Sequence, residues 1–427
     1  MWQDGRVRRR RPIALVALAT LLLLLIPPSV GLARPGQSPP PTPVPLPGGG
    51  TSPSPFPQAL RTPSSSNQPP SVAAGAVVLA DLDTSQILWG TEADERRPIA
   101  SITKIMTALI VTQRTDPSDV VTVSPDATAP APSAAAAELG LVPGERISIQ
   151  DLLYALLLQS ANDAAVALAE HVAGSVEGFV EEMNAEARRL HLADTRFTSP
   201  NGLDDTGYSS ARDLAVLTRA AFESPLFASI VRTKFHRIPS PSGRPRMIQN
   251  RNVLLWLYPG ALGVKTGFTT PAGFCVVAAA TRDGLRLVAV VLGEPGEPFS
   301  DAAAVLDYGF GSFERRELVV GGQGFGSVAI GGRDVRVSAG SGLTGLVPVG
   351  ARIQLVVTVR PDVAFPPAMG EPVGYLKVSA PNLRLGRVPL LVSALPSPPP
   401  AEPGPWWRRA GSAVVQGVSS VLSSLFG

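Results

Sequence analysis

The sequence has one cysteine, Cys275, and only three histidines among its 427 residues. A single cysteine excludes an intramolecular disulfide bond, so any folded part depends on a noncovalent core. His171, His191 and His236 are far apart, and no His-Glu-x-x-His sequence is present, so a zinc hydrolase is unsupported. We therefore expect a buried Cys275, structural or surface histidines, and no metal or other cofactor.

Charge is also scarce: 17% of the residues are charged, and the formal net charge is +3. Five arginines and one aspartate precede residue 34, and without them the net charge falls to −1. The basic balance therefore belongs to the N-terminal segment, and it gives no reason to expect nucleic acid as a partner.

That N-terminal segment, residues 1–33, has the composition of a signal peptide. Its arginines precede an apolar run at 13–26, and the small-residue sequence Gly31-Leu32-Ala33 follows. We expect cleavage after Ala33. The alternative is an uncleaved membrane anchor, although 14 apolar residues are short for a span of about 20. Both readings place the rest of the chain outside the cytoplasm.

Two proline-rich segments are expected to be linkers, because their composition cannot form a core. In residues 34–71, 13 of 38 residues are proline, and a shorter segment covers 394–405. The last segment, 406–427, begins Trp-Trp-Arg-Arg and continues as an amphipathic helix, which favours an anchor on a membrane surface over a helix packed on the protein.

Two folded domains are expected between the linkers. In residues 72–315, β-type alternation at both ends surrounds a helical middle, which predicts an α/β domain with one antiparallel sheet. Asp283-Gly284 marks the hairpin between its last two strands. Residues 316–393 are rich in glycine and valine with short alternating runs, which predicts a small all-β domain.

Ser101 and Lys104 are three residues apart at the expected start of a helix, so both side chains lie on one face. A neutral lysine amine there can accept the serine proton and activate the hydroxyl without a histidine. Alone, a Ser-x-x-Lys sequence is weak evidence.

Two further motifs strengthen this interpretation. Ser160-Ala161-Asn162 interrupts a helical run, 59 residues after Ser101, where it can present a hydroxyl and a carboxamide to a cleft. Lys265-Thr266-Gly267 follows 105 residues later, just before the expected hairpin. Lys265 adds positive charge, Thr266 can receive a substrate carboxylate, and Gly267 allows close approach of the backbone. This order is typical of penicillin-binding proteins and β-lactamases.

Four stretches, at 98–107, 151–165, 197–203 and 263–267, resemble the low-molecular-mass penicillin-binding proteins of the D-alanyl-D-alanine carboxypeptidase family. The resemblance extends from about residue 72 to residue 426. It implies an α/β (α+β) catalytic domain of the penicillin-binding-protein and β-lactamase type, with an antiparallel sheet and a helical subdomain. A small all-β C-terminal domain and an amphipathic terminal helix would follow.

The resemblance also implies an activity, a set of partners and a location. The activity is removal of the terminal D-alanine from peptidoglycan pentapeptides. The partners are stem peptides ending in D-Ala-D-Ala, β-lactam antibiotics and, through residues 406–427, the outer face of the cytoplasmic membrane. Cleavage of cross-links by the same acyl-enzyme remains open.

The same resemblance assigns roles to the motif residues. Ser101 is the nucleophile and Lys104 its base, and burial and Lys265 are expected to lower the pKa of Lys104. Ser160 and Asn162 complete the proton relay and hold the substrate amide. The residues expected to bind or polarise the substrate are Lys265, Thr266, Gly267 and, through the backbone N–H groups of the oxyanion hole, Ser101 and Phe268.

The sequence departs from the family pattern at two places. An arginine common after the strand that follows Lys-Thr-Gly is replaced by the acidic stretch 293–297, so Arg251 or Arg286 is a candidate to bind the substrate carboxylate. Gly207 stands where a histidine often precedes a Tyr-Ser pair.

The sequence fits two other functions less well, a β-lactamase and a non-catalytic envelope protein. A β-lactamase needs a base for fast deacylation, and its candidates Glu170, Glu177 and Glu181 fall in helical patterns. A non-catalytic envelope protein that only binds peptidoglycan is disfavoured because every motif residue is intact.

Overall fold

The computed structural model describes residues 68–129 and 137–395. The expected signal peptide at 1–33, nearly all of the linker at 34–71, and the terminal helix at 406–427 lie outside the described residues. So does the second linker, except for residues 394 and 395.

One five-stranded antiparallel sheet organises the first domain, in the order β2-β1-β9-β8-β7. The N-terminal hairpin therefore pairs with the C-terminal one through β1 and β9, which confirms the predicted sheet. Asp283 and Gly284 connect β8 to β9 with positive φ at both positions, the backbone of a type I′ turn. The strands are β1 (Ala76–Asp81), β2 (Ile87–Thr91), β7 (Ala261–Thr269), β8 (Gly273–Arg282) and β9 (Leu285–Glu294).

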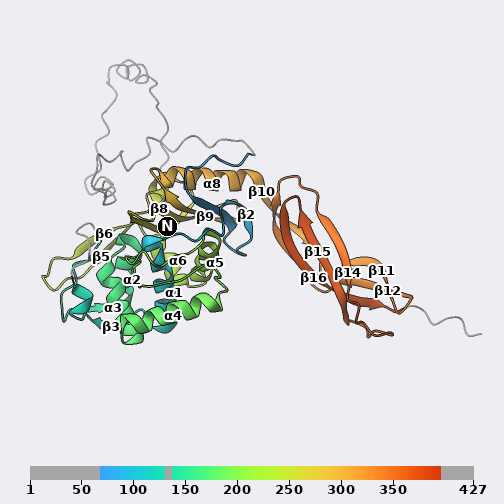
Figure 1. Ribbon diagram of the computed structural model, residues 1–427, viewed down its shortest axis with the longest axis horizontal. Coiled ribbons are helices and arrows are strands. Elements are labelled where there is room, and N and C mark those ends of the chain that lie inside the picture. Colours follow the sequence, from blue (N-terminus) through green and yellow to red (C-terminus); the bar gives the residue numbers. More distant parts are fainter. Residues whose placement is uncertain (1–67, 130–136, 396–427) are drawn as a thin grey trace, which may run out of the picture. The chain divides into compact units, whose positions relative to one another are not determined.

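Helices cover both faces of this sheet, as Figure 1 shows. Helix α8 (Pro298–Ser312) packs on one face through Phe299, Val305 and Leu306, against strand residues such as Leu79. The other face and the remaining helices share a second, larger core. The alternate residues of β1, β8 and β9 are buried on both faces, so these strands are hydrophobic throughout.

The helical layer contains most of the motifs. Ser210 caps α5 by accepting a hydrogen bond from Asp213 N, as its sequence predicts. The helices are α1 (Lys104–Arg114), α2 (Ile149–Tyr154), α3 (Asn162–Ala173), α4 (Val176–Arg189), α5 (Ala211–Phe222), α6 (Pro225–Val231) and α7 (Leu254–Leu257), with 3₁₀ turns η1 (Ala100–Thr103) and η2 (Asp126–Thr128) and the π-helix η3 (Ala155–Gln159). Two strand pairs, β3 (Val120–Thr122) with β4 (Arg146–Ser148) and β5 (Phe235–Ile238) with β6 (Arg246–Gln249), complete it.

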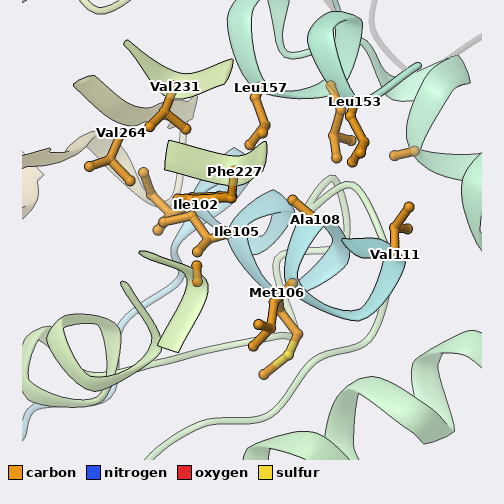
Figure 2. Packing of buried hydrophobic residues seen from close by; sticks show 14 of the residues in the cluster. Ile102, Ile105, Met106, Ala108, Val111, Leu153, Leu157, Phe227, Val231 and Val264 are labelled. Atoms are coloured by element: carbon orange, nitrogen blue, oxygen red, sulfur yellow. The ribbon is translucent and has the colours of Figure 1, made fainter. Parts of the chain in front are cut away.

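Helix α1 is the centre of this layer, because its residues from Lys104 to Val111 are all buried. Figure 2 shows Ile105, Ala108 and Val111 among side chains of other elements, including Leu153 and Phe227. A helix packed on all sides cannot shift easily, so the residues at its start are rigidly placed.

The second domain is entirely β within the described residues, which confirms the predicted fold class. A sheet in the order β11-β12-β16-β15-β14 and a separate pair, β10-β13, enclose their own core of mainly valine and leucine. β10 crosses the expected domain boundary at residue 315. The strands are β10 (Phe313–Val319), β11 (Gly324–Ile330), β12 (Arg333–Ala339), β13 (Leu343–Pro348), β14 (Gln354–Val359), β15 (Pro372–Ala380) and β16 (Leu383–Ala394).

Cys275 is buried on β8, as expected, and burial raises the pKa of its thiol to about 11. Of the histidines, His171 and His191 are exposed, whereas His236 hydrogen-bonds Asp151 and stacks on Tyr154. Over the described ranges, no single helix has the length and hydrophobicity of a membrane span, although the bent pair α5 and α6 together passes by length and composition alone.

Candidate active site

Ser101 and Lys104 meet at the start of α1. Ser101 lies in the 3₁₀ turn η1, Lys104 is the first residue of α1, and Lys104 Nζ is 2.8 Å from Ser101 Oγ. The preceding residue, Ala100, has a φ of 47°, a left-handed conformation that is costly for alanine. Such strain is characteristic of functional sites, where it orients a reactive side chain.

The Lys104 amine has three neighbours that fix its chemistry. Besides Ser101 Oγ, it contacts Asn162 Oδ1 at 2.8 Å and the main-chain oxygen of Asn201 at 2.6 Å. The two carbonyl oxygens can only accept hydrogen bonds. A neutral amine gives them its two hydrogens, and its lone pair is then left for the proton of Ser101.

Asn201 was not among the predicted site residues. Its role depends on a main-chain oxygen, which any residue type supplies, so residue identity gave no signal. The next residue, Gly202, did carry a signal in its identity. A Cβ on Gly202 would lie 1.9 Å from the main-chain oxygen of Ala100, and the φ of Gly202 is +77°. The Asn201-Gly202 loop therefore contacts the backbone next to the nucleophile so closely that only glycine fits.

The Ser160-Ala161-Asn162 motif forms a corner, as predicted. Ser160 ends the π-helix η3 with a φ of 67°, and Asn162 begins α3. This turn directs Asn162 toward Lys104. The Ser160 side chain is buried at this corner, two residues before Asn162.

Strand β7 brings the third motif to the same place. A Cβ on Gly267 would lie 3.0 Å from Ser101 N, so the strand passes directly beside the nucleophile. Lys265 is buried and donates a hydrogen bond to Thr266 O at 2.7 Å. Thr266 and Phe268 lie on either side of Gly267 on this strand. Three segments that are distant in the chain therefore converge on Ser101.

The electrostatic setting favours an uncharged Lys104. Burial is the main cause that lowers its pKa, to about 7, with a smaller lowering by Arg251, while the charges of Glu138 and Asp163 act in the opposite direction. The expected burial effect is confirmed, but the charge of Lys265 is not among the causes that act on Lys104; the charge of Lys104 acts on Lys265 instead. Burial, then the charges of Lys104 and Arg251, hold the pKa of Lys265 well below its usual range.

The two arginines proposed for carboxylate binding lie in different places. The main-chain N–H of Arg251 donates a hydrogen bond to Leu158 O in η3. The charge of the Arg251 guanidinium acts on both Lys104 and Lys265. Arg286 forms an ion pair with Asp83 at the β8–β9 hairpin. Thr266 on β7 pairs with Val276 on β8, whereas Arg286 on β9 pairs with Thr281. Thr281 is five residues along β8 from Val276, a distance of about 16 Å. The suggestion of Arg286 is therefore wrong, because it lies near the opposite end of the sheet from Thr266.

The glutamates considered for a β-lactamase are on helices, as their patterns predicted. Glu170 on α3 accepts a hydrogen bond from Ser124 Oγ, and Glu177 and Glu181 are exposed on α4. The carboxyl groups whose charge acts on Lys104 are instead Glu138 and, to a smaller extent, Asp163, neither of which the sequence singled out. Across residues 68–129 and 137–395, no cluster of histidine, cysteine and acidic side chains forms a metal site.

The family model described as D-alanyl-D-alanine carboxypeptidase matches residues 63–296. Among curated relatives, D-alanyl-D-alanine carboxypeptidase DacD of Escherichia coli is 43% identical over 53% of this chain and 60% of its own length. D-alanyl-D-alanine carboxypeptidase DacF of Bacillus subtilis is 34% identical over 57% of this chain and 64% of its own. The chain thus spans less than two thirds of the length of both relatives.

Solved structures extend the likeness to the second domain. Penicillin binding protein 5 of Haemophilus influenzae superposes with a TM-score of 0.65 at 30% identity, over 76% of this chain and 98% of that one. Penicillin binding protein 6B of Escherichia coli gives a TM-score of 0.61 at 33% identity, over 76% and 97%. Both alignments cover more of this chain than the family model does, since that model ends at residue 296.

Proposed function

The chain belongs to the D-alanyl-D-alanine carboxypeptidase family, and we propose that it is itself a serine-type carboxypeptidase that removes the terminal D-alanine from peptidoglycan pentapeptides. The observation that carries the proposal is the position of Lys104 Nζ, which is in hydrogen-bonding contact with Ser101, Asn162 and Asn201 at once. This arrangement serves one purpose well, which is to deprotonate a serine hydroxyl.

In the acylation step, Lys104 accepts the Ser101 proton as Oγ bonds to the carbonyl carbon of the penultimate D-alanine. The backbone N–H groups of Ser101 and Phe268 donate to the resulting oxyanion, and each such donor typically contributes about 3–4 kcal/mol. The proton then passes to the nitrogen of the departing D-alanine, with the Ser160 hydroxyl as relay. The C–N bond breaks, and an ester on Ser101 remains.

Three groups in and beside β7 recognise the terminal carboxylate. The Thr266 hydroxyl binds it, the buried Lys265 amine donates a hydrogen bond to Thr266 O, and the Arg251 guanidinium, whose charge acts on Lys265, supplies positive charge. The amide nitrogen of Asn162 is free to hold the substrate, because Asn162 Oδ1 already accepts from Lys104. Water hydrolyses the ester in the second step, with the Lys104 amine as base.

Release of D-alanine from a synthetic pentapeptide tests this function. We expect release by the wild type, none by Ser101→Ala, and normal release by the control Ser242→Ala on the exposed β5–β6 turn. A tetrapeptide lacking the last D-alanine should give no product. Binding of the pentapeptide without release would favour the non-catalytic envelope protein instead.

A β-lactamase remains a second candidate only through Glu138, a carboxyl group whose charge acts on Lys104. Turnover of penicillin separates the two functions. We expect a carboxypeptidase to remain acylated after one turnover, whereas a β-lactamase would release hydrolysed penicillin at an ordinary enzymatic rate, about 1–1000 per second.

The segments at the two ends support an envelope location, in which residues 1–33 direct export and residues 406–427 hold the protein on the outer face of the cytoplasmic membrane. The support is compositional: the apolar run at 13–26 and the Trp-Trp-Arg-Arg sequence at 406–409. Fractionation of cells expressing the full chain and a chain ending at 405 tests it. Equal membrane recovery of both would contradict the role of 406–427.

A further inference from the structure

Glu138 is tied to the first turn of α3, the helix that carries Asn162. The Asn162 N–H donates to Ala137 O at 2.8 Å, and the Asp163 N–H donates to Glu138 Oε2, also at 2.8 Å. The first turn of a helix has no internal acceptors for these N–H groups. Ala161, at the N-cap, provides no side-chain cap, so residues 137 and 138 replace it.

The contact is reciprocal, which makes the segment rigid. The carboxylate of Asp163 accepts hydrogen bonds from the backbone N–H groups of Leu139, Gly140 and Leu141, at 2.9–3.0 Å. Gln159, at the end of η3, donates to Glu138 O at 2.8 Å. Glu138 is therefore fixed beside both ends of the Ser160-Asn162 corner, and its side chain is not a freely rotating surface group.

Glu138 also faces charge. The groups around Lys104 are Glu138, Asp163 on α3, Arg251, and Lys265 on β7. Glu138 has the largest effect of the charged groups on Lys104, and it raises the pKa of that amine. Burial and then the charge of Asp163 raise the pKa of Glu138 itself to about 7.

We propose that Glu138 is a positioning residue for acylation, which holds Asn162 against Lys104 and whose carboxylate stabilises the ammonium that Lys104 becomes when it takes the Ser101 proton. This inference rests on the proposed function. The proton moves from Ser101 Oγ to Lys104 Nζ and then, through the Ser160 hydroxyl, to the leaving nitrogen. Glu138 neither gains nor loses a proton during the step.

The test is the pH dependence of acylation by a fluorescent penicillin, measured on the full chain as wild type, Glu138→Gln, Glu138→Asp and Glu181→Gln. Glutamine keeps the hydrogen bond from Asp163 N–H but removes the charge. The acid limb of the pH–rate profile is the fall in acylation rate toward low pH. In Glu138→Gln we expect the midpoint of this limb to move about one pH unit lower and the maximal rate to fall about tenfold. Aspartate should restore the wild-type limb at least in part, and the exposed control Glu181→Gln on α4 should match the wild type.

Unfolding of Glu138→Gln at low pH would lower the rate there and raise the midpoint of the acid limb, so it cannot imitate a shift to lower pH. If the limbs of Glu138→Gln and wild type coincide, the inference is overturned even where the rate falls. Failure of the wild type to be acylated at any pH would instead refute the proposed function.

Discussion

The main-chain oxygen of Asn201 lies 2.6 Å from Lys104 Nζ, a shorter contact than the 2.8 Å from that amine to the Ser101 hydroxyl. It is an acceptor that cannot change its protonation or rotate away, so it holds one hydrogen of the amine permanently. The loop at 197–203 thereby helps to orient the amine of the base Lys104, although it contains none of the three motifs that define the site.

Gly202→Ala tests the contribution of this loop. The new Cβ would lie 1.9 Å from Ala100 O, and the residue would keep a strained φ of +77°. Because a displacement of about 1 Å at an active site can cost about 100-fold in rate, we expect penicillin acylation to fall about 100-fold.

Gly243→Ala is the matched control for Gly202→Ala. Gly243 has the same φ of +77°, but nothing lies within 4 Å of its Cβ position. It should lose about 1 kcal/mol of stability and no activity. Equal acylation rates for the two variants would show that the contact between Gly202 and Ala100 is unimportant.

Asn162→Asp tests the charge state of Lys104. The wild-type acylation rate should fall tenfold per pH unit below about 7, because the protonated amine cannot accept the serine proton. A carboxylate 2.8 Å from the amine favours the ammonium, so the limb should move up by about 1–3 units. Stopped-flow acylation from pH 5 to 10 measures both limbs, with Asn382→Asp in the β15–β16 turn as control. A limb that stays in place in Asn162→Asp would mean that Lys104 is not the titrating base.

Arg251→Gln tests recognition of the substrate carboxylate. A hydrogen bond to a charged group contributes about 1.5–3 kcal/mol, so kcat/KM for the pentapeptide should fall about 10- to 100-fold. Arg286→Gln removes a surface ion pair with Asp83 and should change kcat/KM less than twofold. The opposite ranking of the two variants would restore Arg286 as the carboxylate ligand.

The parts of the structure that follow local rules could be predicted from the sequence. The Asp283-Gly284 turn and the Ser210 cap depend on neighbours in the chain, and so does the run of β-type residues that marks β1, β8 and β9, although these strands are hydrophobic throughout and do not alternate. The joining of the two hairpins in one sheet followed from them. The Ser101 and Lys104 pair was equally local, since three residues of helical backbone set its geometry.

The contacts that sequence reading missed are all between distant segments. Asn201 acts through its backbone, which has no side-chain signature. Glu138 acts through a fold that brings it to α3, 25 residues away. Arg251 and Arg286 are indistinguishable by composition, and only the ladder of β7, β8 and β9 places Arg286 far from Thr266.

The most direct test of the account is the mass of the protein after reaction with penicillin, followed by mapping of the modified peptide. We predict one penicilloyl group on Ser101 in the wild type, none in Ser101→Ala, and acylation slowed by orders of magnitude in Lys104→Ala, which lacks the base. An adduct on any other residue, or equal labelling of Ser101→Ala, would contradict the assignment of Ser101 as the nucleophile activated by Lys104.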